Sequence, residues 1–214
     1  MSWVVVIPFK GAPDAKSRLA GAFEDDVRAR LALGFLFDTI SAAREVPDVA
    51  AILVVSNEPG LDRALGSSEC VAPHSSLAGV EVLPDPGDGL NAAIAYGIDE
   101  YRSGPHAAGH IAALLGDLPG LTVTELAEAL AQAEAHPMSY VPDRAGTGTT
   151  MITLAPGVDA GPLFGPGSAA AHAAAGFTAL DIPDESGLRN DVDSVEHLDH
   201  VTPGRYTKPL LRKN

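Results

Sequence analysis

The sequence is poor in cysteine, in basic residues and in long apolar runs. Cys70 is the only cysteine among 214 residues, so the chain cannot form an intrachain disulfide framework. Lys and Arg number 14 against 28 Asp and Glu, a net charge of -14, and nucleic acid binding needs a strongly basic surface instead. No apolar run approaches the roughly 20 residues of a membrane span, and the first residues lack the basic stretch of a signal peptide. We therefore expect a cytoplasmic protein with no nucleic-acid and no membrane partner.

Short apolar runs alternate with helical patterns over the first two-thirds of the chain. The runs that predict strands are 3–7, 51–55, 80–83 and 111–115, and the helical patterns that follow them are 24–44, 60–65, 90–101 and 122–134. Four strand–helix pairs in succession are typical of a parallel, doubly wound sheet. In the third helix, Leu90 and Ile94 are expected to face the core. The prediction is an α/β fold with a mostly parallel central sheet and helices on both faces.

The last third of the chain is less regular. It predicts strands at 138–141, 149–154 and 178–182, and short helices at 169–175 and 194–199. No repeat and no long linker appears, so the chain is interpreted as one domain. The tail, 203–214, is rich in bases and is expected to be a mobile end or a dimer arm.

One acid, Asp117, follows the apolar run 111–115 where that predicted strand ends. The helix after it begins with the Thr-x-x-Glu spacing of a capping box, at Thr122 and Glu125. In open α/β sheets ligands bind beyond the carboxyl ends of the strands. Asp117 is therefore either a loop acid that caps its turn or a metal-holding acid beneath a nucleotide.

A second acidic pair, Asp191 and Asp193, lies far along the chain. In an extended segment both carboxylates point to one side, because side chains alternate with a period of two. Mg²⁺ binds carboxylate oxygens together with substrate phosphates. Together with Asp117 the pair predicts a clamp for one or two Mg²⁺ ions on a nucleotide. The simpler alternative is that Asp193 only caps the helix that follows.

The loop after the first strand carries Lys10, Gly11, Lys16 and Arg18. It matches neither Gly-x-x-x-x-Gly-Lys-Ser, because Lys10 and Ala15 stand at the glycine positions, nor Gly-x-Gly-x-x-Gly. A loop with three cations at this position suits a triphosphate whose charge is neutralised by side chains and a metal. A solvated basic loop is the alternative.

Two glycine-rich segments of the last third, Gly146–Thr149 and Gly165–Ser168, offer backbone N–H groups and hydroxyls to an anion. Ser168 stands at the start of a predicted helix, where phosphates are commonly bound. Turn chemistry with an N-cap is equally consistent with either segment alone. Two such segments favour a second, phosphorylated substrate.

A weaker signal is Gly89-Leu90-Asn91, between a predicted strand and a helix of the first half. The Asn91 side chain has the donors and acceptor to bind a base or a ribose. It is as readily an asparagine near a helix N-cap.

The ordered set of these segments resembles the phospholactate and phosphoenolpyruvate guanylyltransferases of coenzyme F-420 biosynthesis. The resemblance covers nearly the whole chain, and its specific parts are Asp-Arg-x-Gly-Thr-Gly-Thr and Phe-Gly-Pro-x-Ser. It implies a single-domain, Rossmann-like nucleotidyltransferase fold like that of the molybdenum-cofactor guanylyltransferases. It also implies GTP, Mg²⁺ and a phosphorylated three-carbon acid bound at Thr149, Gly165 and Ser168. The segments that carry it are 15–19, 89–91, 116–119, 143–149, 164–168 and 191–193.

The predicted reaction is attack of the acid's phosphate on the α-phosphorus of GTP, with release of pyrophosphate. Residues 1–135 are expected to bind the nucleotide and 136–202 the acceptor, within one domain. The metal ligands are expected to be Asp117 and one or both of Asp191 and Asp193. Lys16 and Arg18 are expected to neutralise the triphosphate, as catalytic residues with Asp117. The nucleotide-binding residues are expected to be Lys10, Gly11, Lys16, Gly89 and Asn91.

Several acceptor substrates are compatible with the sequence. Abundant Ala and Gly with few Lys suggest a GC-rich genome, and on that association phosphoenolpyruvate is favoured over 2-phospho-L-lactate. A further alternative is 3-phosphoglycerate. A molybdopterin or sugar phosphate would need more aromatic or inserted residues than this chain supplies. A catalytically silent nucleotide-binding module is opposed by the presence of all three acids. A homodimer is also expected.

Overall fold

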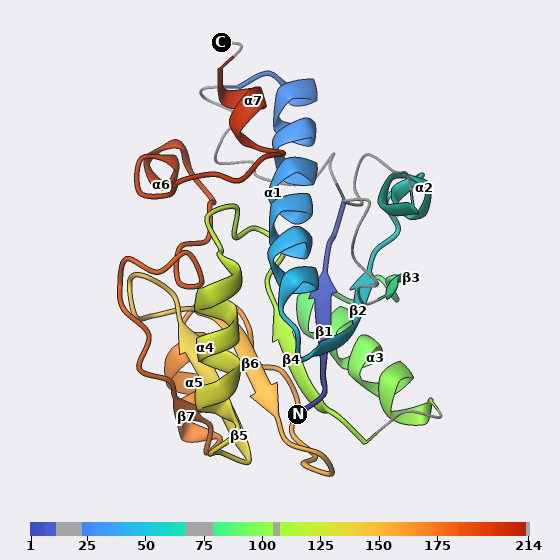
Figure 1. Cartoon of the computed structure of the whole chain (residues 1–214), viewed down its shortest axis with the longest axis vertical. Coiled ribbons are helices and arrows are strands. Elements are labelled where there is room, and N and C mark those ends of the chain that lie inside the picture. The colour runs from blue at the N-terminus through green and yellow to red at the C-terminus, as the bar shows by residue number, and fades with distance from the viewer. Residues whose placement is uncertain (12–22, 67–78, 105–107, 213–214) are drawn as a thin grey trace.

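The computed structural model describes residues 1–11, 23–66, 79–104 and 108–212. Lys16, Arg18 and Cys70 lie outside the described residues. The centre of the molecule is a seven-stranded sheet in the order β3-β2-β1-β4-β6-β5-β7 (Figure 1). Its strands are β1 (Trp3–Pro8), β2 (Val49–Val55), β3 (Gly79–Leu83), β4 (His110–Leu114), β5 (Met138–Pro142), β6 (Thr149–Leu154) and β7 (Thr178–Ala179).

Six of the seven strands run in the same direction. β1 is parallel to both β2 and β4, β2 is parallel to β3, and β5 is parallel to β7. β6 is antiparallel to both of its neighbours, β4 and β5, which leaves β4 and β5 pointing the same way. The predicted mostly parallel α/β sheet is confirmed, and β6 is its one reversed strand.

The first four strands each precede a helix, as predicted. The described helices are α1 (Asp25–Glu45), α2 (Leu61–Gly66), α3 (Leu90–Ser103), α4 (Val123–Ala133), α5 (Ser168–Ala174), α6 (Val195–Leu198) and α7 (Lys208–Leu211). None of them is long and apolar enough to cross a membrane. The expected strand over 178–182 is wrong beyond Ala179, where the chain leaves the sheet.

Successive side chains of β1 pack on opposite faces of the sheet, which explains its unbroken apolar run. Val5 and its alternate neighbours lie in a core with α1 and α4, and Val6 lies in a second core with α3 and α5. Figure 1 shows α1 and α4 in front of the sheet and α3 and α5 behind it. α3 approaches closely because Gly97 has no side chain: a Cβ there would lie 2.6 Å from Val6 Cγ1. Leu90, which was expected to face the core, is instead 41% exposed.

The described part of the C-terminal tail packs on α1 of its own chain, so the expected mobile end is wrong there. Buried Asp38 of α1 accepts the backbone N–H groups of Tyr206 at 2.9 Å and Thr207 at 3.0 Å. Leu210 of α7 lies against Gly34, whose missing side chain leaves room for it. These contacts hold the segment against its own subunit, and a role as a dimer arm stays a prediction.

Candidate active site

The sheet has a topological switch point between β1 and β4. From β1 the chain passes to β2 on one side, and β4 then pairs with β1 on the other. Crevices at the carboxyl ends of such strands are where α/β proteins bind ligands. A cavity of about 330 Å³ opens at this place. It is lined by Pro8, Phe9, Lys10, Gly11, Ala32, Leu90, Leu115, Gly116, Asp117, Asp191 and Asp193.

The three predicted acids come together at the edge of this cavity. One carboxylate oxygen from each of Asp117, Asp191 and Asp193 lies within 4.8 Å of the others, and all three residues are half-buried. The predicted alternation holds, because Val192 between the pair is buried against Leu31 and the α1 core. Three converging carboxylates are the oxygen-only donor set that Mg²⁺ requires, so the residues fit that ion.

Tight packing fixes the turn that carries Asp117. A Cβ on Gly116 would lie 3.1 Å from Ile7 Cγ2 and 3.1 Å from Leu36 Cδ1, so a larger residue would require these two side chains to shift. The backbone N–H of Leu118 donates to the Thr39 hydroxyl of α1 at 3.2 Å. Both ends of the Asp117 peptide are therefore held by α1 and the sheet.

The capping box at the start of α4 is confirmed, and it reaches beyond its own helix. Thr122 and Glu125 exchange hydrogen bonds as predicted, and the second carboxylate oxygen of Glu125 accepts from Gly187 N at 2.8 Å. Burial raises the pKa of Glu125, but the hydrogen bonds from Thr122 and Gly187 outweigh it and lower the pKa overall. The ionised carboxylate thus holds the loop that leads into Asp191 beside the turn after Asp117.

The nucleotide-side residues divide into those in the cavity and those around it. Lys10 and Gly11 line the cavity, and Gly11 has a φ of 105° that only glycine adopts readily. Gly89 is the N-cap of α3. Both polar atoms of the Asn91 amide bind the backbone of Phe164, at 2.9 and 2.8 Å. Asn91 thereby fastens the 163–168 loop to α3, and its contact with a base or ribose stays a prediction.

The three residues expected to hold the acceptor gather around a residue that was not predicted, His172. Its Nε2 accepts the Leu163 N–H at 3.0 Å, so in the neutral ring Nδ1 carries the hydrogen and donates to Thr149 Oγ1 at 3.0 Å. Burial lowers the pKa of His172, which favours this neutral form. Ser168 is buried, its Oγ makes no hydrogen bond to a described residue, and its N–H binds Gly165 O. The feature of the sequence that could have drawn attention to His172 is that it is a single histidine in an alanine-rich helix.

A second cavity, of about 450 Å³, lies on the other side of the acidic pair. It shares Asp191 and Asp193 with the first cavity, so the two meet at the acids. Sequence reasoning assigned no individual role to its other residues, although Asp143 and Arg144 belong to a motif that carries the family resemblance. These are Asp143, Arg144, Ala145, Asn190, His197 and His200.

Solved structures of low sequence identity share this fold. A protein from Desulfovibrio desulfuricans G20, described as a nucleotide-diphospho-sugar transferase, superposes with a TM-score of 0.67 at 18% identity, covering 100% of this chain and 96% of that one. A nucleotidyl transferase from Methanothermobacter superposes with a TM-score of 0.53 at 16% identity, covering 100% and 99%. The fold is that of a nucleotidyltransferase.

The sequence comparisons narrow that class. The family model described as Guanylyl transferase CofC like matches residues 3–159, and this chain belongs to that family. A phosphoenolpyruvate guanylyltransferase from Salinispora arenicola is 44% identical over 92% of this chain and 86% of the relative. One from Sanguibacter keddieii is 40% identical over 98% and 84%.

Proposed function

We propose that the protein transfers GMP from GTP to the phosphate of phosphoenolpyruvate, with release of pyrophosphate, as a step in coenzyme F-420 biosynthesis. The observation that carries the proposal is the cluster of Asp117, Asp191 and Asp193 at the switch point of a nucleotidyltransferase fold. The names of the relatives support phosphoenolpyruvate as the acceptor. A cytoplasmic location and a homodimer stay predictions from the sequence.

Guanylyl transfer requires the protein mainly to position the two substrates and to neutralise their charge. A phosphate oxygen of the acceptor forms a bond to the α-phosphorus of GTP, and the bond from that phosphorus to the pyrophosphate oxygen breaks. The acceptor phosphate is already a nucleophile, so no protein nucleophile is needed. Binding the two substrates in line and neutralising their charge supplies most of the acceleration in transfers of this kind.

The three acids would hold Mg²⁺, which neutralises the phosphate oxygens of both substrates when bound. Asp117 sits on a turn that α1 and the sheet hold rigidly, and Asp191 and Asp193 approach it from the other side. Rigid support of this kind keeps the ligand geometry from relaxing between turnovers. The half-buried position of the acids also limits competition from solvent.

The cavity beside β1 is the proposed nucleotide site. Lys10, Gly11 and Gly89 lie at or near it, and Lys16 and Arg18 are the proposed partners of the triphosphate from the loop outside the described residues. The proposed acceptor site lies around Thr149, Gly165 and Ser168, at the start of β6 and the loop before α5. The buried Ser168 hydroxyl is a polar group for which a bound acceptor offers a hydrogen bond.

The experiment is Asp117→Asn, assayed as pyrophosphate release from GTP and phosphoenolpyruvate over a range of Mg²⁺ concentrations. The expected result is a fall in kcat on the order of 100-fold or more that saturating Mg²⁺ does not restore. Asp62→Asn, at an exposed acid of α2, is the matched control and should behave as the wild type. Near-wild-type transfer by Asp117→Asn would show that the metal role is wrong.

The same assay separates the alternatives. Phosphoenolpyruvate, 2-phospho-L-lactate and 3-phosphoglycerate are compared at equal concentration with GTP, and phosphoenolpyruvate should give the highest kcat/KM. Preference for another acid would move the proposal to that acceptor, and no release with any of them would point to a bulkier phosphate or to a silent module.

A further inference from the structure

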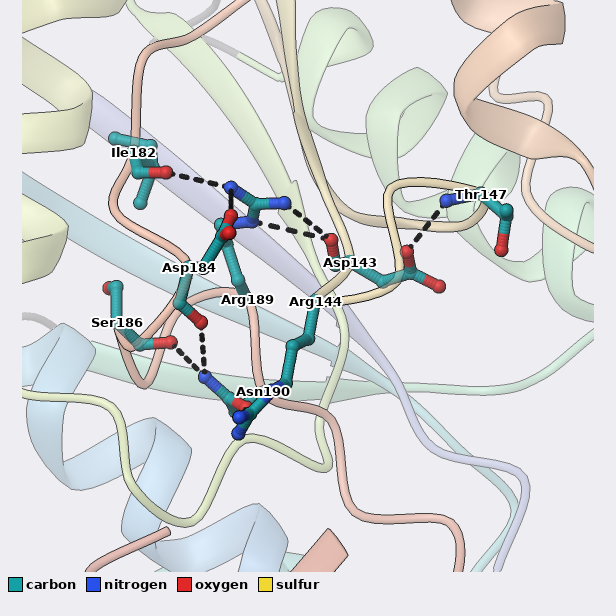
Figure 2. Close-up of polar contacts among 8 residues, drawn as sticks. All are labelled: Asp143, Arg144, Thr147, Ile182, Asp184, Ser186, Arg189 and Asn190. Carbon is teal, nitrogen blue, oxygen red and sulfur yellow. Dashed lines mark hydrogen bonds and ion pairs between the residues drawn. The ribbon is translucent and has the colours of Figure 1, made fainter. Parts of the chain in front are cut away.

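Two arginines of the described chain are about equally buried but differ in how their guanidinium groups are bonded. The side chain of Arg189 is 12% exposed, and that of Arg28 is 13% exposed. Arg189 donates to Asp143 O through Nε at 3.3 Å and Nη2 at 2.9 Å, and to Ile182 O through Nη1 at 2.9 Å (Figure 2). It also pairs with the carboxylate of Asp184. The donors of Arg189 are thus used by its own chain.

Arg28, in the first turns of α1, has fewer partners. Its Nη2 donates to the carboxylate of Asp25, which lies three residues earlier and is 95% exposed. Its Nε is buried and has no hydrogen-bond partner among the residues that the structure describes. A buried guanidinium N–H without an acceptor costs free energy, because water no longer solvates it. A bound anion beside Arg28 would supply the missing acceptor.

The position of Arg28 on α1 places it beside the candidate nucleotide site. Residues four apart lie on one face of a helix, and Arg28 is followed at this spacing by Ala32 and Leu36. Leu36 lies against Gly116, in the turn that carries the first acid. Ala32 lines the cavity of about 330 Å³. Arg28 is one turn, about 5.4 Å, further along this line, and Figure 1 shows the first turns of α1 extending beyond the carboxyl end of β1.

The acidic pair lies on the same side of α1. Leu31 packs with Val192, the residue between the two acids of the pair. Successive residues of a helix are about 100° apart, so Arg28 lies between the direction of Leu31 and that of Ala32. Its bond to Asp25 shows that the side chain leans toward the N-terminus of the helix. The guanidinium therefore lies past the rim of the cavity, at its α1 wall.

The face of the sheet indicates which anion Arg28 meets. In Figure 1, α1 covers the front of the sheet, whereas α5, whose first turn belongs to the proposed acceptor site, covers the back. The α-phosphate of GTP and the acceptor phosphate have to meet at the metal, so the β- and γ-phosphates are the anionic groups left to extend toward α1. The base and the ribose are uncharged and form no ion pair. A guanidinium fork matches phosphate oxygens in both geometry and charge.

We propose that Arg28 binds the β- and γ-phosphates of GTP and stabilises them as they leave as pyrophosphate. This inference rests on the proposed function, since it names a contact of one substrate in that reaction. When the bond from the α-phosphorus to the bridging oxygen breaks, its electron pair stays on that oxygen, and the negative charge of the pyrophosphate grows. A cation held at this place binds the transition state more strongly than the substrate. Arg28 therefore contributes to kcat as well as to the binding of GTP.

The test measures nucleotide binding by calorimetry with Mg²⁺ and without an acceptor, so that no transfer occurs. Kd for GTP should rise on the order of 10- to 100-fold in Arg28→Gln, as expected for loss of charge-assisted hydrogen bonds, whereas Kd for GMP should stay within about twofold. Arg28→Lys keeps the charge without the fork and should lie between the wild type and Arg28→Gln. Thermal unfolding without nucleotide verifies that each variant folds.

Two controls separate phosphate binding from the ion pair and from the overall charge of α1. Asp25→Asn breaks the pair with Arg28 from its exposed end, and Arg30→Gln removes a cation from the exposed face of the same helix. Both should leave Kd for GTP within about twofold. Steady-state kinetics should agree with the binding: Arg28→Gln raises KM for GTP and lowers kcat, while KM for phosphoenolpyruvate stays within about twofold.

Three results overturn the inference: an equal loss of affinity for GTP and GMP in Arg28→Gln, a loss in Asp25→Asn as large as that in Arg28→Gln, or unchanged binding of GTP in Arg28→Gln. A wild type that binds GTP but transfers GMP to none of the acids removes the proposed function, and the binding results still decide the role of Arg28. A wild type that does not bind GTP removes both. An active wild type with an unaffected Arg28→Gln removes this inference alone.

Discussion

The backbone N–H of Val192 donates to the carbonyl oxygen of Asp117 at 3.0 Å. This bond joins the turn after β4 to an extended segment from near the end of the chain. It sets the register of that segment, so that Val192 faces the α1 core and the acids on either side of it face Asp117. The geometry of the acid cluster therefore depends on how Val192 is buried.

Val192→Ala tests this dependence. The side chain is fully buried, and its truncation should lower the free energy of unfolding by about 1–3 kcal/mol. Because the acids lose their anchor, the Mg²⁺ concentration for half-maximal activity should rise roughly 10-fold. Val5→Ala, in the middle of β1, should lose similar stability without the change in Mg²⁺ requirement. An equal Mg²⁺ requirement in the two variants would contradict the anchoring role.

Much of the nucleotide half could be predicted from sequence because its signals are local. A continuous apolar run, a Gly-Asp turn and a capping box each depend on neighbouring residues, and β4 and α4 follow from them. That Asp117 lies near Asp191 and Asp193 could be predicted from two general facts. Side chains of an extended segment alternate with a period of two, and the carboxyl ends of parallel strands meet at one edge of the sheet. What local signals cannot show is the Val192–Asp117 bond, because it joins positions from opposite parts of the chain.

His197 holds the same segment from its outer side. Its Nδ1 lies 2.8 Å from the carbonyl oxygen of Asp191, and since a carbonyl only accepts, Nδ1 carries the hydrogen. Because Nδ1 then has no lone pair to accept with, its 3.4 Å contact with the Asp193 N–H is not a hydrogen bond. His197 is thus a positioning residue for the acids.

Substitutions at His197 distinguish this hydrogen bond from simple packing. His197→Asn places an amide N–H where Nδ1 was and should keep the Mg²⁺ requirement within about twofold. His197→Gln places the amide N–H at the Nε2 position instead. Both His197→Gln and His197→Ala should raise the Mg²⁺ requirement roughly 10-fold. The measurement is the Mg²⁺ dependence of pyrophosphate release. If all three variants respond alike, the Nδ1 bond has no positioning role.

Thr39 supports the Asp117 turn from α1. Its hydroxyl donates to Phe35 O at 2.9 Å and accepts the Leu118 N–H at 3.2 Å, and the residue is fully buried. Thr39→Val keeps the shape but leaves the Leu118 N–H without its acceptor, which should cost about 1–3 kcal/mol in denaturant unfolding. Thr39→Ser keeps the acceptor and should lose clearly less. A loss in Thr39→Ser with none in Thr39→Val would mean that only the methyl group matters.

The acceptor half was harder to predict, and particular residues show why. Gly165 and Ser168 can be recognised from sequence because they lie in a glycine-rich segment before a predicted helix. Nothing nearby in the chain indicates that Asn91 of α3 holds their loop through Phe164. The prediction of a mobile tail was wrong for a similar reason: it rested on the bases of the tail, whereas the contact that orders the tail is made by a buried acid, Asp38. Each such contact joins distant positions and has no local period.

His172 makes stability depend on pH in a direction that follows from its burial. The ring binds Leu163 N and Thr149 Oγ1 in its neutral form, and burial lowers its pKa below the ordinary 6.5. Above pH 6.5 the histidine is neutral in both folded and unfolded chains, and its contribution is complete. As pH falls below 6.5 the unfolded chain takes up a proton that the folded chain refuses, so stability is lost until the lowered pKa is reached.

His172→Asn removes the titrating group while its amide keeps a donor for Thr149. The free energy of unfolding of both proteins is measured in urea between pH 8 and about pH 5, where the other six histidines titrate in both and cancel in the difference. The advantage of the wild type should shrink as pH falls, by about 1.4 kcal/mol for each unit by which the pKa is lowered. KM for the acceptor should rise more in the wild type than in His172→Asn once the pH approaches the lowered pKa, because only then does the folded ring take up a proton and release the Leu163 N–H. A difference that stays constant with pH would show that His172 is not held neutral.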